Sequence, residues 1–244
     1  MPFFAPVSSG GIPLATVTAT TGSPTIDTSS RSGKTIYKFT GSGTITIGTA
    51  GTCEYMVLGP GGSNGAGGYR YTTSGILPAG TLTVIVGAGS QSYVAPNESQ
   101  LNDIIGLGGG SGQAPFTSTG TSGASGAGAS ATAAQGGIVG TAKLSGYQGY
   151  AGGYGNAPMG GPPAIGGGGG AGGVGGDAPS TNTGGSGGAG VANSITGTST
   201  TYCAGGGGYG TSITGSPSGA GAANTGNGGG SAIGGSGFVV VVIG

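Results

Sequence analysis

The chain has 244 residues, of which 68 are glycine, whereas a typical protein contains about 7% glycine. Five basic and five acidic residues give a formal net charge of zero, and only 4% of residues are charged, against about 25% in an average domain. This excludes the basic surface with which proteins bind nucleic-acid phosphates. Because the chain also has no histidine, most proton-transfer and metal chemistry lacks candidate residues. We expect no enzyme activity, cofactor or metal.

Residues 1–30 are rich in proline, serine and threonine, without a periodic apolar pattern. Pro2, Pro6 and Pro13 interrupt the apolar residues, which is not the pattern of a secretion signal. A terminal stretch of this kind becomes ordered when another molecule holds it. We therefore expect residues 1–30 to form an extended attachment arm.

The next segment, residues 31–105, contains short runs rich in β-branched and aromatic residues, each bounded by Gly, Ser, Asn or Pro, which is typical of strands. These runs cover residues 36–40, 44–47, 53–58 and 81–86. Residues 98–105 have an apolar spacing that a helix would also allow, but the run is short and we interpret it as a strand.

The last run, Phe238–Ile243, is apolar throughout. The absence of polar alternation predicts a central strand that is buried on both faces. At six residues the run is also far shorter than the roughly 20 that cross a membrane, so we expect no membrane insertion. Because this strand must pair with strands earlier in the chain, the segment between them is an insertion in one β-module.

This inserted body, residues 106–236, contains 48 glycines in 131 residues and only two charges, Lys143 and Asp177. Its G-G-X runs predict left-handed helices with three residues per turn. Such helices have no internal hydrogen bonds, so they must lie side by side and bond to one another, as in polyglycine II. The alternative is a flexible glycine and serine linker.

Together these patterns predict an all-β fold with almost no α-helix. The N- and C-terminal strands form a small β-sandwich-like module around a body of packed polyglycine II helices. The expected boundaries are an arm at residues 1–30, module strands at 31–105, the body at 106–236, and a closing strand at 237–244.

Two further motifs carry little weight. Residues 28–35 end like a phosphate-binding loop, but Thr28 replaces its first glycine and a strand-like run follows instead of a helix, so we interpret the match as chance. Cys53 and Cys203 lie 150 residues apart. They are either buried thiols or a disulfide that links the module to the body.

Tyrosine is the residue type that suggests a binding site. Tyr147, Tyr150 and Tyr154 lie close together among Ser, Gly and Asn, which is the mixture that binding loops use. We predict these three tyrosines as receptor-binding residues. The alternative is that their rings cover the ends or sides of the glycine bundle.

Four stretches carry a family resemblance. They are YMVLGPGG at residues 55–62, GAGGYR at 65–70, VIVGAG at 84–89, and GSGFVVVV at 235–242. In this order they resemble the glycine-rich domain of bacteriophage tail-fibre and related virion proteins. The chain departs from that pattern at Pro60 and in the tyrosine-rich stretch. The architecture is also similar to that of phage tail-tip adhesins with polyglycine II bundles.

The resemblance implies a bacteriophage virion protein, located in a tail fibre or on the capsid surface. As a tail fibre or receptor-binding tip, the chain would attach the particle to its host through a surface glycan or an outer-membrane protein. A capsid-decorating or head-fibre protein without a receptor is the alternative, and an ice-binding protein with stacked glycine helices is a third. If the chain is a virion protein, residues 1–30 would bind other virion proteins. Whether the chain forms a homo-oligomer stays open.

Overall fold

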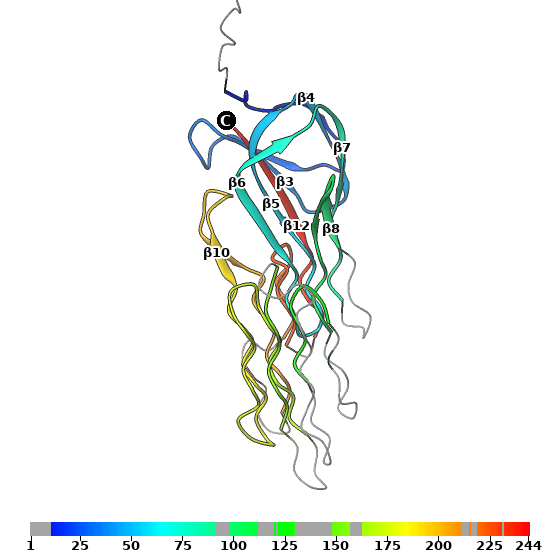
Figure 1. The fold of residues 1–244 in the computed structure, drawn as a ribbon, viewed down its shortest axis with the longest axis vertical. Coiled ribbons are helices and arrows are strands. Elements are labelled where there is room, and N and C mark those ends of the chain that lie inside the picture. Colours follow the sequence, from blue (N-terminus) through cyan, green and yellow to red (C-terminus); the bar gives the residue numbers. More distant parts are fainter. Residues whose placement is uncertain are drawn as a thin grey trace, which may run out of the picture.

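The computed structural model describes residues 11–90, 98–111, 120, 122–129, 148–156, 163–210, 215, 219–230 and 232–244. Figure 1 shows a β-module at one end and an elongated body that extends from it. The described residues contain strands and no helix. The predicted all-β fold is therefore confirmed.

The described residues form twelve strands. They are β1 (Thr16–Thr20), β2 (Thr25–Asp27), β3 (Thr35–Phe39), β4 (Gly43–Thr49), β5 (Gly51–Leu58), β6 (Tyr69–Leu77), β7 (Gly80–Ile85), β8 (Ser99–Leu101), β9 (Ile104–Gly106), β10 (Val191–Asn193), β11 (Thr200–Tyr202) and β12 (Phe238–Ile243). The interpretation of residues 98–105 as strand rather than helix is confirmed, but the segment forms two antiparallel strands, β8 and β9, separated by a turn at Asn102 and Asp103.

The β-module consists of two five-stranded sheets. The first has the order β2-β3-β12-β5-β6, and the second has the order β1-β4-β7-β8-β9. Strand β12 is antiparallel to both of its neighbours, with Val241 opposite Tyr37 on one side and Tyr55 on the other. The predicted central position of the last strand is confirmed, and its valines are buried. The strand closes the sheet that the first part of the chain begins.

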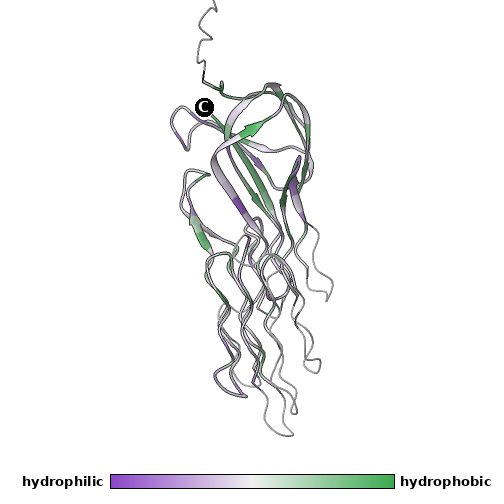
Figure 2. Cartoon of the chain, viewed as in Figure 1, coloured by the Kyte–Doolittle hydropathy of each residue, from purple (hydrophilic) through white to green (hydrophobic). Residues whose placement is uncertain are grey.

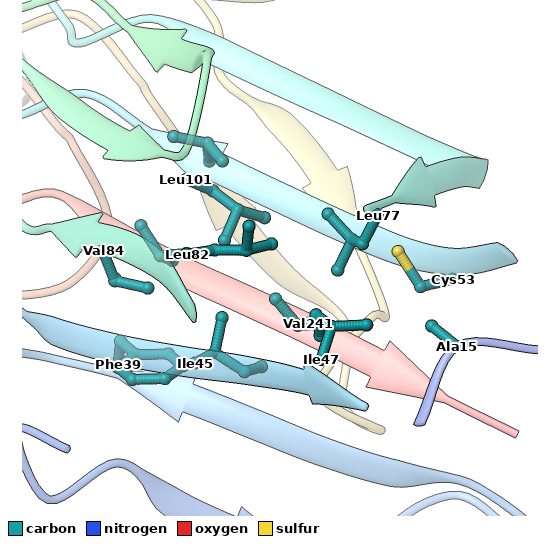
Figure 3. Close-up of a cluster of buried hydrophobic side chains, with 12 residues drawn as sticks. Ala15, Phe39, Ile45, Ile47, Cys53, Leu77, Leu82, Val84, Leu101 and Val241 are labelled. Carbon is teal, nitrogen blue, oxygen red and sulfur yellow. The ribbon is translucent and has the colours of Figure 1, made fainter. Parts of the chain in front are cut away.

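The core of the module lies between the two sheets. Alternate residues of each strand point inward, because successive side chains of a strand face opposite sides. Figure 3 shows these side chains pointing toward one another, with Phe39 and Val241 from the first sheet and Ile45 and Leu82 from the second. Figure 2 shows that strongly hydrophobic residues concentrate in these strands, whereas the body is pale.

The outer face of the first sheet is covered by the hairpin of β10 and β11. Ile195 in its turn and Tyr202 in β11 are buried against Met56 and Val240 of the sheet. The guanidinium of Arg31 also donates a hydrogen bond of 3.2 Å to the carbonyl of Ile195. The hairpin therefore fixes the body against the module.

The prediction that residues 1–30 form an attachment arm is wrong for residues 11–30. Within residues 1–30, strand β1 pairs with β4 in the second sheet, and β2 pairs with β3 in the first. Ala15 is fully buried in the core. Strand β1, in which Thr alternates with apolar residues, lies at the edge of the second sheet. Its alternating pattern is too short to be recognised as a strand from the sequence. Residues 11–30 thus belong to the module, and residues 1–10 lie outside the described part.

The body is organised around residues 165–171, which we call the central segment. The N–H groups at positions i and i+3 of this segment donate to the same neighbouring segment, and successive positions donate to different neighbours. The donor and acceptor pairs are Gly166 with Ala129, Gly169 with Gly126, Gly167 with Gly176, Gly170 with Gly173, Gly168 with Gly206, and Ala171 with Cys203, at 2.8–3.1 Å. The hydrogen-bonding directions therefore repeat every three residues.

Within the described residues, the central segment has six neighbours. Its carbonyls accept hydrogen bonds from three further segments, through the N–H groups of Ala66, of Tyr150 and Gly153, and of Gly185 and Gly188. The ring segments, in order, are 64–66, 126–129, 150–153, 173–176, 185–188 and 203–206. A backbone hydrogen bond links each ring segment to the following one, and the last segment is linked to the first in the same way. In some pairs the bond is made by the residue that directly precedes or follows the segment. One extended chain is thus enclosed by a closed ring of six.

This close packing explains the longest glycine run of the sequence, residues 166–170. A Cβ on any of these five glycines would lie 1.9–2.1 Å from a backbone carbonyl oxygen of a neighbouring stretch of chain, closer than atoms can approach. None of the five has a positive φ. Glycine is therefore needed here for the space that a missing side chain leaves.

Candidate functional site

Two of the three predicted receptor-binding tyrosines lie within the described part of the chain. Tyr150 and Tyr154 belong to the segment 148–156, and their exposed fractions are 39% and 52%. Tyr147 lies outside the described residues. Both described rings are on the surface of the body, so neither is a core residue.

The backbone on which these tyrosines lie is held on two sides. The N–H of Tyr150 donates to the carbonyl of Gly170 at 3.0 Å, on the side of the central segment. On the other side, the carbonyls of Ala151 and Tyr154 accept from Gly175 and Ala178 at 2.9 and 2.8 Å. The two tyrosines are therefore presented from a hydrogen-bonded backbone.

The neighbouring segment places two further residues beside this one. Both hydrogen bonds to this neighbour join residues that are 24 positions apart, so residues 150–154 and 174–178 run parallel and in register. This register places Val174, which is 63% exposed, across from Tyr150. Asp177 lies beside Tyr154, and its Oδ1 accepts a hydrogen bond of 2.7 Å from the N–H of that tyrosine. We call Tyr150, Tyr154, Val174 and Asp177 the lateral strip.

In the sequence, Asp177 is one of two charges in the body, and nothing there connects it with the tyrosines. Its isolation in an almost uncharged segment was the available signal. Val174 offered no signal, because a single valine among glycines suggests only packing. Both residues join the strip through a backbone register that glycine runs do not encode.

The other described tyrosines outside the sheet core have different surroundings. Tyr209 is 45% exposed, but its chain continues from ring segment 203–206, opposite segment 150–153 across the central segment. Tyr202 is buried under the hairpin. Tyr69 accepts a hydrogen bond from Asn193 through its hydroxyl, and Tyr71 donates one to Glu54. These contacts join the hairpin and strands of the module.

Asn64 connects several glycine segments through its side chain. Its side chain is nearly fully buried and donates through Nδ2 to the carbonyls of Gly206 and Gly207 at 3.2 and 3.0 Å. Its Oδ1 accepts from the N–H of Gly128 at 2.6 Å. The donor and acceptor atoms of the side-chain amide thus all have protein partners, and we interpret Asn64 as a structural link between three segments.

The two cysteines are free thiols, and no disulfide joins the module to the body. Burial, together with the nearby Glu54 carboxylate, raises the pKa of Cys53 to about 11. Burial also raises the pKa of Cys203. A buried thiol in apolar surroundings stays protonated and unreactive. In the described part of the chain, no three His, Cys, Asp or Glu side chains are grouped as a metal site would require.

The two ends of the molecule differ in character. Figure 1 shows the C-terminus and the first described residues on the side of the β-module away from the body. The carbonyl oxygen of Gly244 accepts a hydrogen bond from Lys34 there, and Pro13 accepts one from the N–H of Thr52. The body therefore projects away from the end at which the chain enters and leaves the module.

No family model, curated protein or solved structure matches the chain. Among the described residues there is no helix that is long and apolar enough to span a membrane.

Proposed function

We propose that this chain is a bacteriophage virion protein, a tail fibre or its receptor-binding tip, which attaches the particle to its host. The observation that carries the proposal is that the two ends of the molecule differ. The described chain ends lie at one end of the module, the body projects from the other, and the exposed tyrosines lie on the body. Such a shape suits a protein that is fixed at one end and binds at the other.

We further infer that the body is a polyglycine II bundle. A left-handed helix with three residues per turn makes no internal hydrogen bonds and directs its N–H groups to three neighbours in turn. The donors of the central segment follow this period from Gly166 to Ala171. The bundle gives the particle a stiff projection without a large hydrophobic core, because backbone hydrogen bonds hold it together at about 1 kcal/mol each.

The lateral strip is the candidate receptor-binding surface. Tyrosine combines a large contact area with a polar hydroxyl and loses little conformational entropy on binding. The surface has little charge, so binding would depend on ring contacts and hydrogen bonds rather than on electrostatic steering. A capsid-decorating protein would have the same architecture but no use for an exposed aromatic surface on its body.

Immunogold electron microscopy tests the proposal directly. Antibodies against the full chain should label the tail end of particles that carry the protein, and they should block adsorption of these particles to host cells. Label on the head alone would support the capsid-decorating alternative. Purified particles that contain no trace of the protein by mass spectrometry would exclude a virion role.

A further inference from the structure

We propose that exposed non-glycine residues on the side of the body prevent a second copy of the chain from packing against the bundle there. This inference goes beyond the proposed function and does not depend on it. It concerns ring segments 173–176 and 185–188 and the residues next to them, where the chain reads GGVGGD at 172–177 and GGSGGAG at 184–190. One residue in three is not glycine in both stretches. We call Val174, Asp177, Ser186 and Ala189 the outer residues.

In segment 173–176, hydrogen bonds account for the directions that face the bundle. The N–H of Gly175 donates to the ring segment on one side at 2.9 Å, and the N–H of Gly176 donates to the ring segment on the other side at 2.7 Å. Positions three apart on a helix with three residues per turn point the same way. Val174 and Asp177 occupy the remaining direction, and both are exposed, whereas Gly175 is buried.

Segment 185–188 has the same arrangement. The N–H groups of Gly185 and Gly188 donate to the central segment at 3.0 and 2.8 Å, and both glycines are buried. Ser186 and Ala189 are again three positions apart, and both are exposed. In both segments, the residues that carry side chains therefore lie on the row that faces away from the bundle.

The positions are glycine on the side where a further stretch of chain packs against the ring. The run Gly205–Gly208 is buried throughout. A Cβ on Gly206 would lie 2.3 Å from the carbonyl oxygen of Gly229, which is outside the ring. The N–H of Gly228 also donates to the carbonyl of Ala204 at 2.8 Å. The chain thus has glycine where packing continues outward, and the outer residues where packing ends.

A continuous row of glycine on the outside of the bundle would be a docking surface for a second copy. Polyglycine segments approach so closely that a Cβ on residues 166–170 would lie 1.9–2.1 Å from a carbonyl oxygen. The outward N–H and carbonyl groups of a glycine row would bond to a matching backbone, as the free edge of a sheet does. The body of a second copy offers that backbone with the same spacing. A Cβ at every third position prevents the approach.

The test compares two variants of the full chain. The glycine variant combines Ser186→Gly with Ala189→Gly, so that residues 184–190 are all glycine. The matched control is Ser186→Ala, which removes the hydroxyl and keeps a Cβ at both outer positions. In analytical ultracentrifugation, the weight-average mass of the glycine variant should rise with concentration to about twice that of the wild type and fall again on dilution. The control should sediment like the wild type.

Two outcomes of this comparison would overturn the inference. One is a glycine variant that keeps its fold by circular dichroism and has the mass of the wild type at every concentration. The other is equal association of the control, which would make the lost hydroxyl the cause rather than the lost Cβ.

Hydrogen exchange of the wild-type protein tests the same geometry without a variant that must fold. The amides of Ser186 and Ala189 should exchange rapidly because they point away from the bundle, whereas those of Gly185 and Gly188 should be protected by their hydrogen bonds to the central segment. Equal protection of all four amides would overturn the inference, because the outer residues would then not face outward.

Discussion

The side-chain oxygen of Asn64 accepts a hydrogen bond of 2.6 Å from the backbone N–H of Gly128, 64 positions further along the chain. The same side chain donates to Gly206 and Gly207, and the backbone carbonyl of Asn64 accepts from the N–H of Gly206 at 2.7 Å. One buried amide therefore joins three segments of the bundle.

Replacing Asn64 by alanine should strongly destabilise the protein. The N–H of Gly128 and the carbonyl of Gly207 would lose their side-chain partner in a buried place, at about 1–3 kcal/mol for each unpaired group. We expect the free energy of unfolding to fall by about 2–6 kcal/mol, measured by chemical denaturation. The matched control is Asn182→Ala in an exposed turn, which should change it little. Similar losses in both variants would contradict the role of Asn64.

Gly168→Ala should also destabilise the body, because the added Cβ would lie 2.0 Å from the carbonyl oxygen of Asn64. Overpacking of this kind typically costs about 1–3 kcal/mol. Gly173→Ala is the control, since its Cβ would have no neighbour closer than 3.6 Å, and it should be neutral or slightly stabilising. Truncating the exposed Val174 to alanine should be close to neutral.

The melting temperatures of Gly168→Ala, Gly173→Ala and Val174→Ala test whether the body is packed through its backbone. If Gly168→Ala had the same melting temperature as Gly173→Ala, the body would not be packed through its backbone.

The two thiols should be unreactive in the folded protein. Burial raises the pKa of both Cys53 and Cys203 above the usual value for cysteine, and a protonated thiol is a poor nucleophile. We expect no labelling by a thiol-specific disulfide reagent at pH 8, and labelling of both cysteines after denaturation. Mass spectrometry without reduction should show two free thiols. Rapid labelling of the native protein would indicate that one cysteine is exposed.

Stability should depend on pH through Asp27. The Ser30 hydroxyl, the N–H of Ser30 and the Lys38 ammonium all favour its charged form and hold its pKa below the usual 3.8. A carboxylate with a lowered folded-state pKa stabilises the fold above its unfolded-state pKa, and this contribution is lost as the pH falls through the folded-state value.

Asp27→Asn should therefore be less stable than the wild type at pH 7, and the difference should narrow as the pH falls below about 4. Urea denaturation at pH 7, 4 and 2.5 would measure it. A difference that stayed constant over this range would show that the carboxylate charge is not the cause.

Much of the module could be predicted from local patterns. The apolar run Phe238–Ile243 indicated a central strand, because a strand buried on both faces has no polar alternation. Strands β1 and β2 could not be predicted, since β1 has five residues, β2 has three, and their pairing partners lie elsewhere in the chain. The tyrosines of segment 148–156 were found from composition, whereas Val174 and Asp177 joined them only through tertiary register.

The sequence by itself determined that the body is held together by its backbone, because 48 glycines in 131 residues leave few side chains to form a core. Tertiary structure alone decided that residues 165–171 form the centre, that Asn64 links three segments, and that Asp177 lies beside Tyr154. The physical reason is that an extended chain of this kind bonds to its neighbours and not to itself. Glycine has no side chain to specify which neighbour or which register, so these choices follow from how all the segments pack together.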